Sequence, residues 1–297
     1  MILVAGSANL DFVVRAPRIP APGETVLGRE FRTFPGGKGA NQAIACARAG
    51  GCETEMLLAL GDDSFAAPIA QSLAQAGVRM HVIQAGEPTG TAFICVSDDA
   101  ENAITVAPGA NSCLRPGQLP LLSGCTHLLM QLETPLDTVV DYARAARAAG
   151  VAVVLNAAPA RLLPPELLSL LDVLVVNKGE LAAVAGRSGS IEQCLVRIDV
   201  PCVVVTLGDR GCCARVAGKL VMQDAFAVMP VDTTAAGDTF CGVLVAELAR
   251  GRALPSALRR ANAAAALACT RAGAQSSIPE YAEVEEFLGR HLRAAAP

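Results

Sequence analysis

The sequence predicts an α/β fold in which a doubly wound, mostly parallel sheet is flanked by helices and carries a small β-sheet lid. Two observations predict this class. Short apolar runs rich in Val and Leu recur along the chain, and Ala-rich segments with helical periodicity separate them. The runs are continuously apolar, as strands are when a parallel sheet is covered on both faces.

The predicted strands begin near the N-terminus and recur at regular intervals. They span 2–6, 55–60, 127–132, 151–156, 172–177 and 202–207. Helices are predicted between them over 40–50, 67–77 and 136–150, each closed by Gly. From residue 232 onward the pattern is almost entirely helical. No linker or internal repeat divides the chain, so we expect a single domain over 1–297.

Two further segments, 23–34 and 91–107, have the pattern of exposed strands and interrupt the early strand–helix units. The second is a hairpin with its turn at DDAEN. These segments predict a small sheet beside the main one. It serves either as a lid over a site or as an edge extension and dimer surface, and the pattern does not separate the two.

Composition excludes several classes of function. A net charge of −4 and a pI near 5.5 argue against nucleic-acid and membrane-surface binding. No apolar run reaches the roughly 18 to 20 residues of a membrane helix, and the first strand lacks a basic leader. The 11 Cys are scattered in apolar contexts without C-x-x-C, which predicts reduced thiols and a cytoplasmic protein.

The stretch DTTAAGDTFCG (232–242) places a carboxylate at the start of an apolar helix. Small residues leave the backbone N–H groups of 235–237 uncovered, and such groups form an anion site together with the helix dipole. A carboxylate beside an anion site is unfavourable unless it takes up a proton during the reaction. Asp238 therefore suits a general base for phosphoryl transfer. The alternative is a surface Asp that complements the dipole.

The segment PGGKGANQA (35–43) is a Gly-rich turn that opens a helix. It fits neither the Walker A spacing nor the dinucleotide fingerprint, because Gly39 follows Lys38 and Gln42 stands at the third Gly position. What remains is a turn whose backbone can approach a ligand closely, with Lys38 and Asn41 around it. A turn without a ligand is the alternative.

Polar residues also follow predicted strands, where α/β sheets bind ligands. In GSANLD, Asn9 and Asp11 alternate and share one face, although an Asx turn would also account for them. Glu133 follows another strand. In NKGE, Asn177 and Glu180 have the spacing of a capping box, and the alternative is a magnesium site.

These motifs together resemble those of the ribokinase-like carbohydrate kinases, in the same order and over essentially the whole chain. The matching segments are GSANLD, PGGKGANQA, Glu133, NAAPA (156–160), NKGE, TLGDRG (206–211), DTTAAGDTF and TRAGAQSSIP (270–279). The resemblance implies ATP-dependent phosphorylation of D-ribose at its 5-hydroxyl to give D-ribose 5-phosphate. It also implies a cytoplasmic homodimer that pairs through the β lid.

The resemblance assigns a role to each matching position. Sugar contacts fall on Asn9, Asp11, Gly36, Gly37, Lys38, Asn41 and Glu133, with Asp238 as catalytic base and Ala235, Ala236 and Gly237 as anion hole. Nucleotide contacts fall on Asn177, Thr206, Gly208, Gly211 and Asn262. Potassium would be held by Asp232, Thr234, Ala268, Arg271, Gly273 and Ser277, and Mg²⁺ indirectly by Asn177 and Glu180.

Three departures from the family's pattern stand out. Lys178 and Gly179 replace the central residues of the usual NETE, Cys241 stands where Asn is common, and Ser276 where Pro is usual. None removes a catalytic group. The alternatives are a kinase for another small sugar or a nucleoside, such as deoxyribose, another pentose or a ribonucleoside, and a sugar-binding regulator without turnover.

Overall fold

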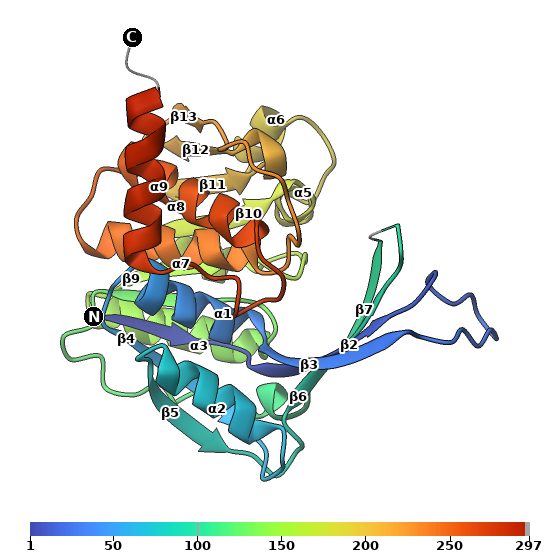
Figure 1. The fold of residues 1–297 in the computed structure, drawn as a ribbon. Helices are drawn as coiled ribbons and strands as arrows, with labels where there is room; N and C mark the ends of the chain where they lie inside the picture. The colour runs from blue at the N-terminus through green and yellow to red at the C-terminus, as the bar shows by residue number, and fades with distance from the viewer. Residues whose placement is uncertain (100, 295–297) are drawn as a thin grey trace.

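A nine-stranded sheet runs through the centre of the computed structural model, which describes residues 1–99 and 101–294 (Figure 1). Seven neighbouring strands are parallel in the order β11-β10-β9-β8-β1-β4-β5, and β12 and β13 extend the sheet antiparallel beyond β11. The strands are β1 (Ile2–Ala5), β4 (Thr54–Leu60), β5 (Arg79–Gln84), β8 (His127–Met130), β9 (Ala152–Asn156), β10 (Val173–Asn177), β11 (Cys202–Thr206), β12 (Cys212–Val216) and β13 (Lys219–Gln223). The predicted fold class is confirmed.

Helices cover both faces of this sheet because successive side chains of each strand point to opposite sides. In β1, Ile2 and Val4 pack into one core, and Leu3 and Ala5 into the other. The first core lies under α1 (Lys38–Ile44), a π-helical turn (Ala45–Ala49), α2 (Ala66–Gln75), α7 (Ala236–Ala249), α8 (Leu254–Cys269) and α9 (Tyr281–Ala294). The second lies under α3 (Leu136–Ala148), α4 (Pro165–Leu170), α5 (Lys178–Ala185) and α6 (Ile191–Leu195).

The lid is a separate four-stranded sheet that projects from one side of the body (Figure 1). Its strand order is β3-β2-β6-β7, built from β3 (Glu30–Gly36), β2 (Asn9–Arg15), β6 (Gly90–Val96) and β7 (Asn102–Ala107). The hairpin predicted over 91–107 is confirmed, although its DDAEN turn includes residue 100, which lies outside the described residues.

The prediction for 23–34 was wrong in its first half, since no strand forms before Glu30. The partner strand β2 ends at Arg15, which pairs with Glu30. Pro17 and Pro20 follow and cannot extend the ladder. A further finding is that β2 itself belongs to the lid. Asn9 and Asp11 therefore stand on its first and third residues, at the root of the lid.

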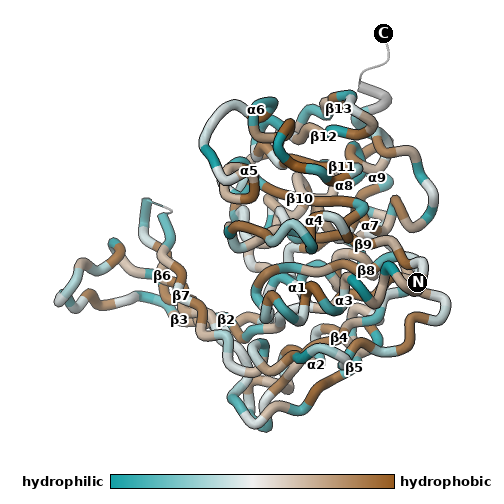
Figure 2. Tube along the Cα trace, turned by 180° about the vertical axis from the view of Figure 1, so that it is seen from behind, coloured by the Kyte–Doolittle hydropathy of each residue, from teal (hydrophilic) through white to brown (hydrophobic). Residues whose placement is uncertain are grey.

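Hydrophobic residues concentrate in the strands of the central sheet, and the strands of the lid also contain hydrophobic residues (Figure 2). Two of the lid's aromatic side chains, Phe31 and Phe93, are more than half exposed. No helix in the described part of the chain is long and apolar enough to cross a membrane.

Candidate active site

Helix α7 begins next to a residue with a strained backbone conformation. Its N-cap, Ala235, has φ of 58°, a left-handed conformation that costs a non-Gly residue roughly 1–2 kcal/mol. Such strain is concentrated at functional sites. The following N–H group, that of Ala236, donates to the carbonyl of Thr233 at 3.3 Å, so an anion bound here would have to replace this contact. Gly237 is exposed and would admit a Cβ without contact.

Asp238 lies in the first turn of α7 and is only 7% exposed, so the alternative of a surface Asp was wrong. Side-chain amides hold both oxygens of its carboxylate. Asn41 Nδ2 donates to Oδ2 and Gln42 Nε2 to Oδ1, each at 2.9 Å. Because each carboxylate oxygen can accept more than one hydrogen bond, a ligand hydroxyl can still donate to it.

Lys38 and Glu133 meet at the start of α1. Glu133 Oε2 accepts the Lys38 N–H at 3.2 Å and the hydroxyl of Ser7 at 2.6 Å. The Ser7 hydroxyl also accepts the N–H of Gly39 at 3.3 Å. Asp238 and, more weakly, Glu133 raise the pKa of the Lys38 ammonium, and together they outweigh the effect of burial. Lys38 is therefore a fixed positive charge between two carboxylates.

The root of the lid holds Asn9 and Asp11 against the body. Asn111, which is almost fully buried, donates to Asn9 Oδ1 at 2.7 Å and accepts the N–H of Ala8 at 2.9 Å. Since Asn9 Oδ1 is taken, its Nδ2 is the group left to donate to a ligand. A Cβ on Gly90 would overlap this amide pair, which explains the Gly at the start of β6.

The carboxyl group of Asp11 is a weak acid in the folded protein. Burial, followed by the nearby carboxylates of Glu133 and Asp238, raises its pKa from 3.8 to about 7, and Lys38 opposes the rise. The folded state therefore retains a proton that the unfolded chain has lost between about pH 4 and pH 7. Linkage then makes this group favour folding at low pH, and that contribution disappears as the pH rises through 7.

We expect Asp11→Asn to change stability in a pH-dependent way. The parent loses free energy of unfolding between pH 5 and pH 8 as Asp11 ionises, whereas the variant has no carboxyl group here to ionise. The difference in free energy of unfolding, variant minus parent, should therefore be larger at pH 8 than at pH 5 by on the order of 1 to 4 kcal/mol. Urea denaturation at the two pH values measures this. An equal stability difference at both pH values would contradict a raised pKa at Asp11.

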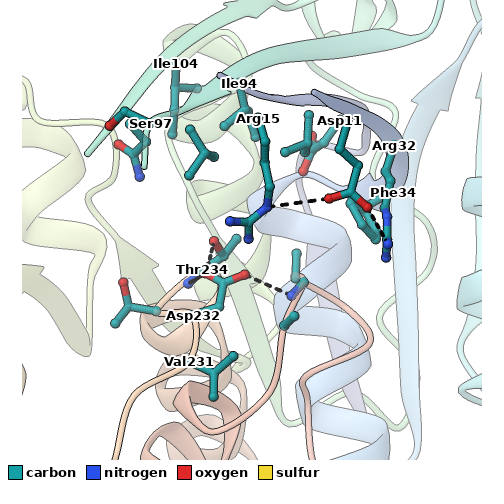
Figure 3. Close-up of a pocket in the computed structure, with 18 of the residues that line it drawn as sticks. Asp11, Arg15, Arg32, Phe34, Ile94, Ser97, Ile104, Val231, Asp232 and Thr234 are labelled. Carbon is teal, nitrogen blue, oxygen red and sulfur yellow. Dashed lines mark hydrogen bonds and ion pairs between the residues drawn. The ribbon is translucent and has the colours of Figure 1, made fainter. Parts of the chain in front are cut away.

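A cavity of about 810 Å³ lies between the lid and the body (Figure 3). Asp11, Arg15 and Arg32 line it from the lid, and Asp232 and Thr234 from the body. Its volume is in the range of small-molecule sites. The cavity therefore connects the root of the lid with the segment that leads into α7.

Asp232 ties the segment before α7 to the loop after α8. Its carboxylate accepts from the Thr234 N–H at 2.9 Å and hydroxyl at 2.6 Å, and from the Gly273 N–H at 2.9 Å. Burial raises the pKa of Asp232, but these hydrogen bonds outweigh burial and lower it. Ser277 is buried and donates to the Ala274 carbonyl at 2.8 Å, while the Ala268 carbonyl accepts the Arg271 N–H at 3.2 Å.

The predicted potassium residues contain one ionised carboxylate, hydroxyls and carbonyls, and their binding of a cation stays a prediction. Among the residues described, no group of three or more His, Cys, Asp and Glu side chains is placed to hold a metal ion.

Asn177 and Glu180 form the capping box at the start of α5, as one of the two sequence interpretations expects. Asn177 Oδ1 accepts the Glu180 N–H at 2.9 Å, and Glu180 Oε2 accepts the Asn177 N–H at 2.7 Å. Burial raises the pKa of the Glu180 carboxyl group. One oxygen of each side chain already serves the helix end, and a contact with Mg²⁺ through water molecules, which this ion commonly keeps, is compatible with that arrangement.

The predicted nucleotide residues lie at the β10 and β11 side of the sheet. Thr206 pairs with Asn177 in the ladder, and Gly208 and Gly211 bound a short 3₁₀ turn with positive φ. Asn262 of α8 directs its Nδ2 toward Cys212 Sγ and the Gln223 carbonyl, both at 3.4 Å. That contact links α8 to the antiparallel strands, and a nucleotide role for these residues stays a prediction.

Five buried polar residues of the site were not assigned a role from sequence. They are Ser7, Gln42, Asn111, Gln131 and Asn156. Ser7 and Gln42 stand inside recognised motifs, and Gln131 and Asn156 stand at strand ends. Their positions in the sequence could therefore have indicated that these four residues belong to the site. Asn111 follows the lid hairpin and had none.

The sequence and the fold of this chain are similar to those of known carbohydrate kinases. Residues 1–281 match the profile of the pfkB family carbohydrate kinases. A ribokinase of Haemophilus influenzae is 41% identical, over 97% of this chain and 98% of its own. A ribokinase of Thermotoga maritima is similar in structure, with a TM-score of 0.90, 34% identity and coverage of 97% and 99%. A ribokinase of Arabidopsis thaliana solved with ribose and ATP has a TM-score of 0.87, 32% identity and coverage of 97% and 98%.

Proposed function

The chain belongs to the pfkB family of carbohydrate kinases, and we propose that its sugar is D-ribose, phosphorylated at the 5-hydroxyl by ATP. The observation that carries the proposal is Asp238, a buried carboxylate held by two amides at the N-terminus of α7 and surrounded by hydrogen-bonding groups. The likeness to a ribokinase solved with ribose and ATP supports the choice of both substrates. The whole chain acts as one domain.

In this mechanism Asp238 takes the proton of the 5-hydroxyl as the oxygen attacks the γ-phosphorus of ATP. The new O–P bond forms while the bond from the γ-phosphorus to the β,γ-bridging oxygen breaks, and ADP leaves with that electron pair. The N–H groups of 235–237 bind the transferred phosphoryl group, after Ala236 gives up its contact with Thr233. The Lys38 charge offsets the surrounding carboxylates.

The sugar is held by the polar groups around the lid root. Asn9 Nδ2 donates to one hydroxyl, and Asp11 and Glu133 accept from others. Asn41 Oδ1 is buried and has no partner among the described residues, so a sugar hydroxyl would satisfy it. Gly36 and Gly37 let the backbone approach closely. The nucleotide would bind at the β10 and β11 side of the sheet, next to Asn177, Thr206, Gly208, Gly211 and Asn262.

Two ions complete the proposal. Asp232, Thr234 and Ser277, with the carbonyls of Ala268, Arg271 and Gly273, would hold K⁺, and the ionised state of Asp232 supports this. Asn177 and Glu180 would hold Mg²⁺ indirectly. When bound, Mg²⁺ neutralises charge on the β- and γ-phosphates and K⁺ adds positive potential beside α7.

Eleven free cysteines are consistent with a cytoplasmic location.

ADP release from ATP and Mg²⁺ tests the proposal with a panel of ribose, 2-deoxyribose, fructose and adenosine, in potassium buffer and in a buffer without monovalent metal cations. We expect selective turnover of ribose, raised by potassium. Turnover of another member of the panel would keep the mechanism and replace the sugar. Ribose or ATP binding without turnover on any substrate would favour a non-catalytic regulator.

We also propose that two chains pair through their lids. Phe12, Phe31 and Phe93 stack on one face of the lid sheet, and Phe31 and Phe93 are 62% and 53% exposed. Apolar area of this kind marks an interaction surface. Phe93→Asp should turn a dimer into a monomer in light-scattering chromatography. Leu121→Asp, at an exposed position in the body, is the control that should leave the dimer intact. A monomeric parent would refute the pairing.

A further inference from the structure

Gln42 makes one of the two hydrogen bonds to the Asp238 carboxylate, from a completely buried position in α1. All the hydrogen-bonding groups of its side-chain amide are used. Nε2 donates to Asp238 Oδ1 at 2.9 Å and to Asn156 Oδ1 at 3.0 Å, and Oε1 accepts from Gln131 Nε2 at 2.6 Å. A fully satisfied buried amide of this kind has one defined position.

The central sheet fixes the direction of this amide. Gln131 follows β8 and donates to it, while Asn156 ends β9 and accepts from it. Asn156 is oriented in turn, because its own Nδ2 donates to the Val175 carbonyl of β10 at 3.2 Å. If the Gln42 amide turned over, its oxygen would face the Asp238 carboxylate and the Asn156 oxygen. Three neighbouring strands therefore determine that an N–H points at Asp238.

We propose that Gln42 is a positioning residue for phosphoryl transfer, which anchors Asp238 Oδ1 to the end of the central sheet and leaves the carboxylate oriented as an acceptor. The inference rests on the proposed role of Asp238 as base and deepens it. Asn41 holds the other oxygen but belongs to the sugar site, so its contact can change when ribose binds. Gln42 has no such second task, and its anchor persists through the reaction.

The charges around Asp238 make this anchor testable by pH. The ionisable groups that interact electrostatically with it include Lys38, Asp11, Glu180 and the Cys241 thiol. Of these four groups, Lys38 is the cation. Replacing the neutral Gln42 amide by a carboxylate would therefore place a like charge within hydrogen-bonding distance of Asp238. One proton would then be shared by the two carboxylates at neutral pH, and the base would be blocked.

The test is the pH profile of Gln42→Glu between pH 5.5 and 9.5, with ribose, ATP and Mg²⁺. At pH 7 we expect kcat to fall at least about tenfold, with the ribose KM within about threefold of the parent value. The midpoint of the acidic limb should move up by at least about one pH unit, and activity should recover toward pH 9.5 as the shared proton leaves. An unmoved limb, or an equal loss at every pH, would overturn the inference.

Gln131→Met is the matched variant and carries the test if Gln42→Glu does not fold. It removes the donor that orients Gln42 without adding charge, and Gln131 Oε1 has no partner among the described residues, so little else is lost. We expect a fall in kcat of at least about threefold with ribose KM and the acidic limb unchanged. An unchanged kcat would count against the anchor.

A readout without turnover separates this inference from the proposed function. In protein labelled with ¹³C at aspartate carboxyl carbons, the Asp238 resonance is identified by its loss in Asp238→Asn. Its titration midpoint should rise by at least about one pH unit in Gln42→Glu. If the parent does not phosphorylate ribose but the midpoint moves, the function fails and the contact stands. If the parent is active and the midpoint does not move, the inference fails.

Discussion

Asp238→Asn is expected to lower kcat for ribose by about 10²- to 10⁴-fold, the range for loss of a general base. An amide cannot accept the proton of the 5-hydroxyl, so the attacking oxygen must lose it to water. The binding of ATP and most of the ribose affinity should persist, because the sugar contacts of Asn9, Asp11 and Glu133 and the N-terminus of α7 are unchanged. Single-turnover kinetics and isothermal titration measure the two quantities separately.

The fold should tolerate Asp238→Asn because the two amides that hold Asp238 can also hydrogen-bond to an asparagine side chain. The new amide oxygen can still accept from Gln42, while its nitrogen would face Asn41 Nδ2. Asn41 can turn its amide, because its Oδ1 has no partner among the described residues and then becomes the acceptor. Thermal unfolding within a few degrees of the parent is the control. A loss of less than tenfold in a folded variant would remove Asp238 from the role of base.

The parallel sheet was predictable because its strands are buried on both faces and therefore appear in the sequence as apolar runs. Strands β5 and β2, which were not predicted, lack this property. In β5 the exposure alternates irregularly along Arg79–Gln84, at one edge of the sheet. In β2 the polar residues Asn9 and Asp11 interrupt the apolar pattern, and the segment 6–8 carries the chain from β1 into the other sheet. No local pattern distinguishes these two destinations.

Asp238 was predictable because its chemistry is local: small residues, a helix start and a carboxylate stand together in the sequence. Its environment was not, because Gln42, Gln131 and Asn156 come from three elements separated by 89 and 114 residues. Their contacts exist only through the order of strands in the sheet. The same holds for Asn111, whose amide reaches Asn9 across 102 residues.

Gly36→Ala is expected to weaken ribose binding at least about 30-fold by displacing Asp11. A Cβ on Gly36 would lie 2.6 Å from Asp11 Cγ and closer still to Asp11 Oδ2, and real Cβ atoms do not approach so closely. The backbone of Gly36 does not have the positive φ that disfavours Ala, so the side chain of Asp11 has to move. A ligand hydroxyl that loses its buried hydrogen-bond partner typically costs about 1–3 kcal/mol of binding, and more where the partner is charged. Calorimetric titration with ribose measures the loss.

A double-mutant comparison decides whether Gly36 acts through Asp11. If it does, Gly36→Ala should add almost nothing to Asp11→Ala, because the carboxylate that the methyl group would displace is already gone. The ATP KM should be unchanged in all three variants, since the nucleotide residues lie at the β10 and β11 side of the sheet. Gly86→Ala, where a Cβ meets nothing within 4 Å, controls for the general cost of adding a methyl group. Additive losses would mean instead that the sugar contacts the Gly36 backbone directly, and that the absence of a side chain there serves the ligand and not Asp11.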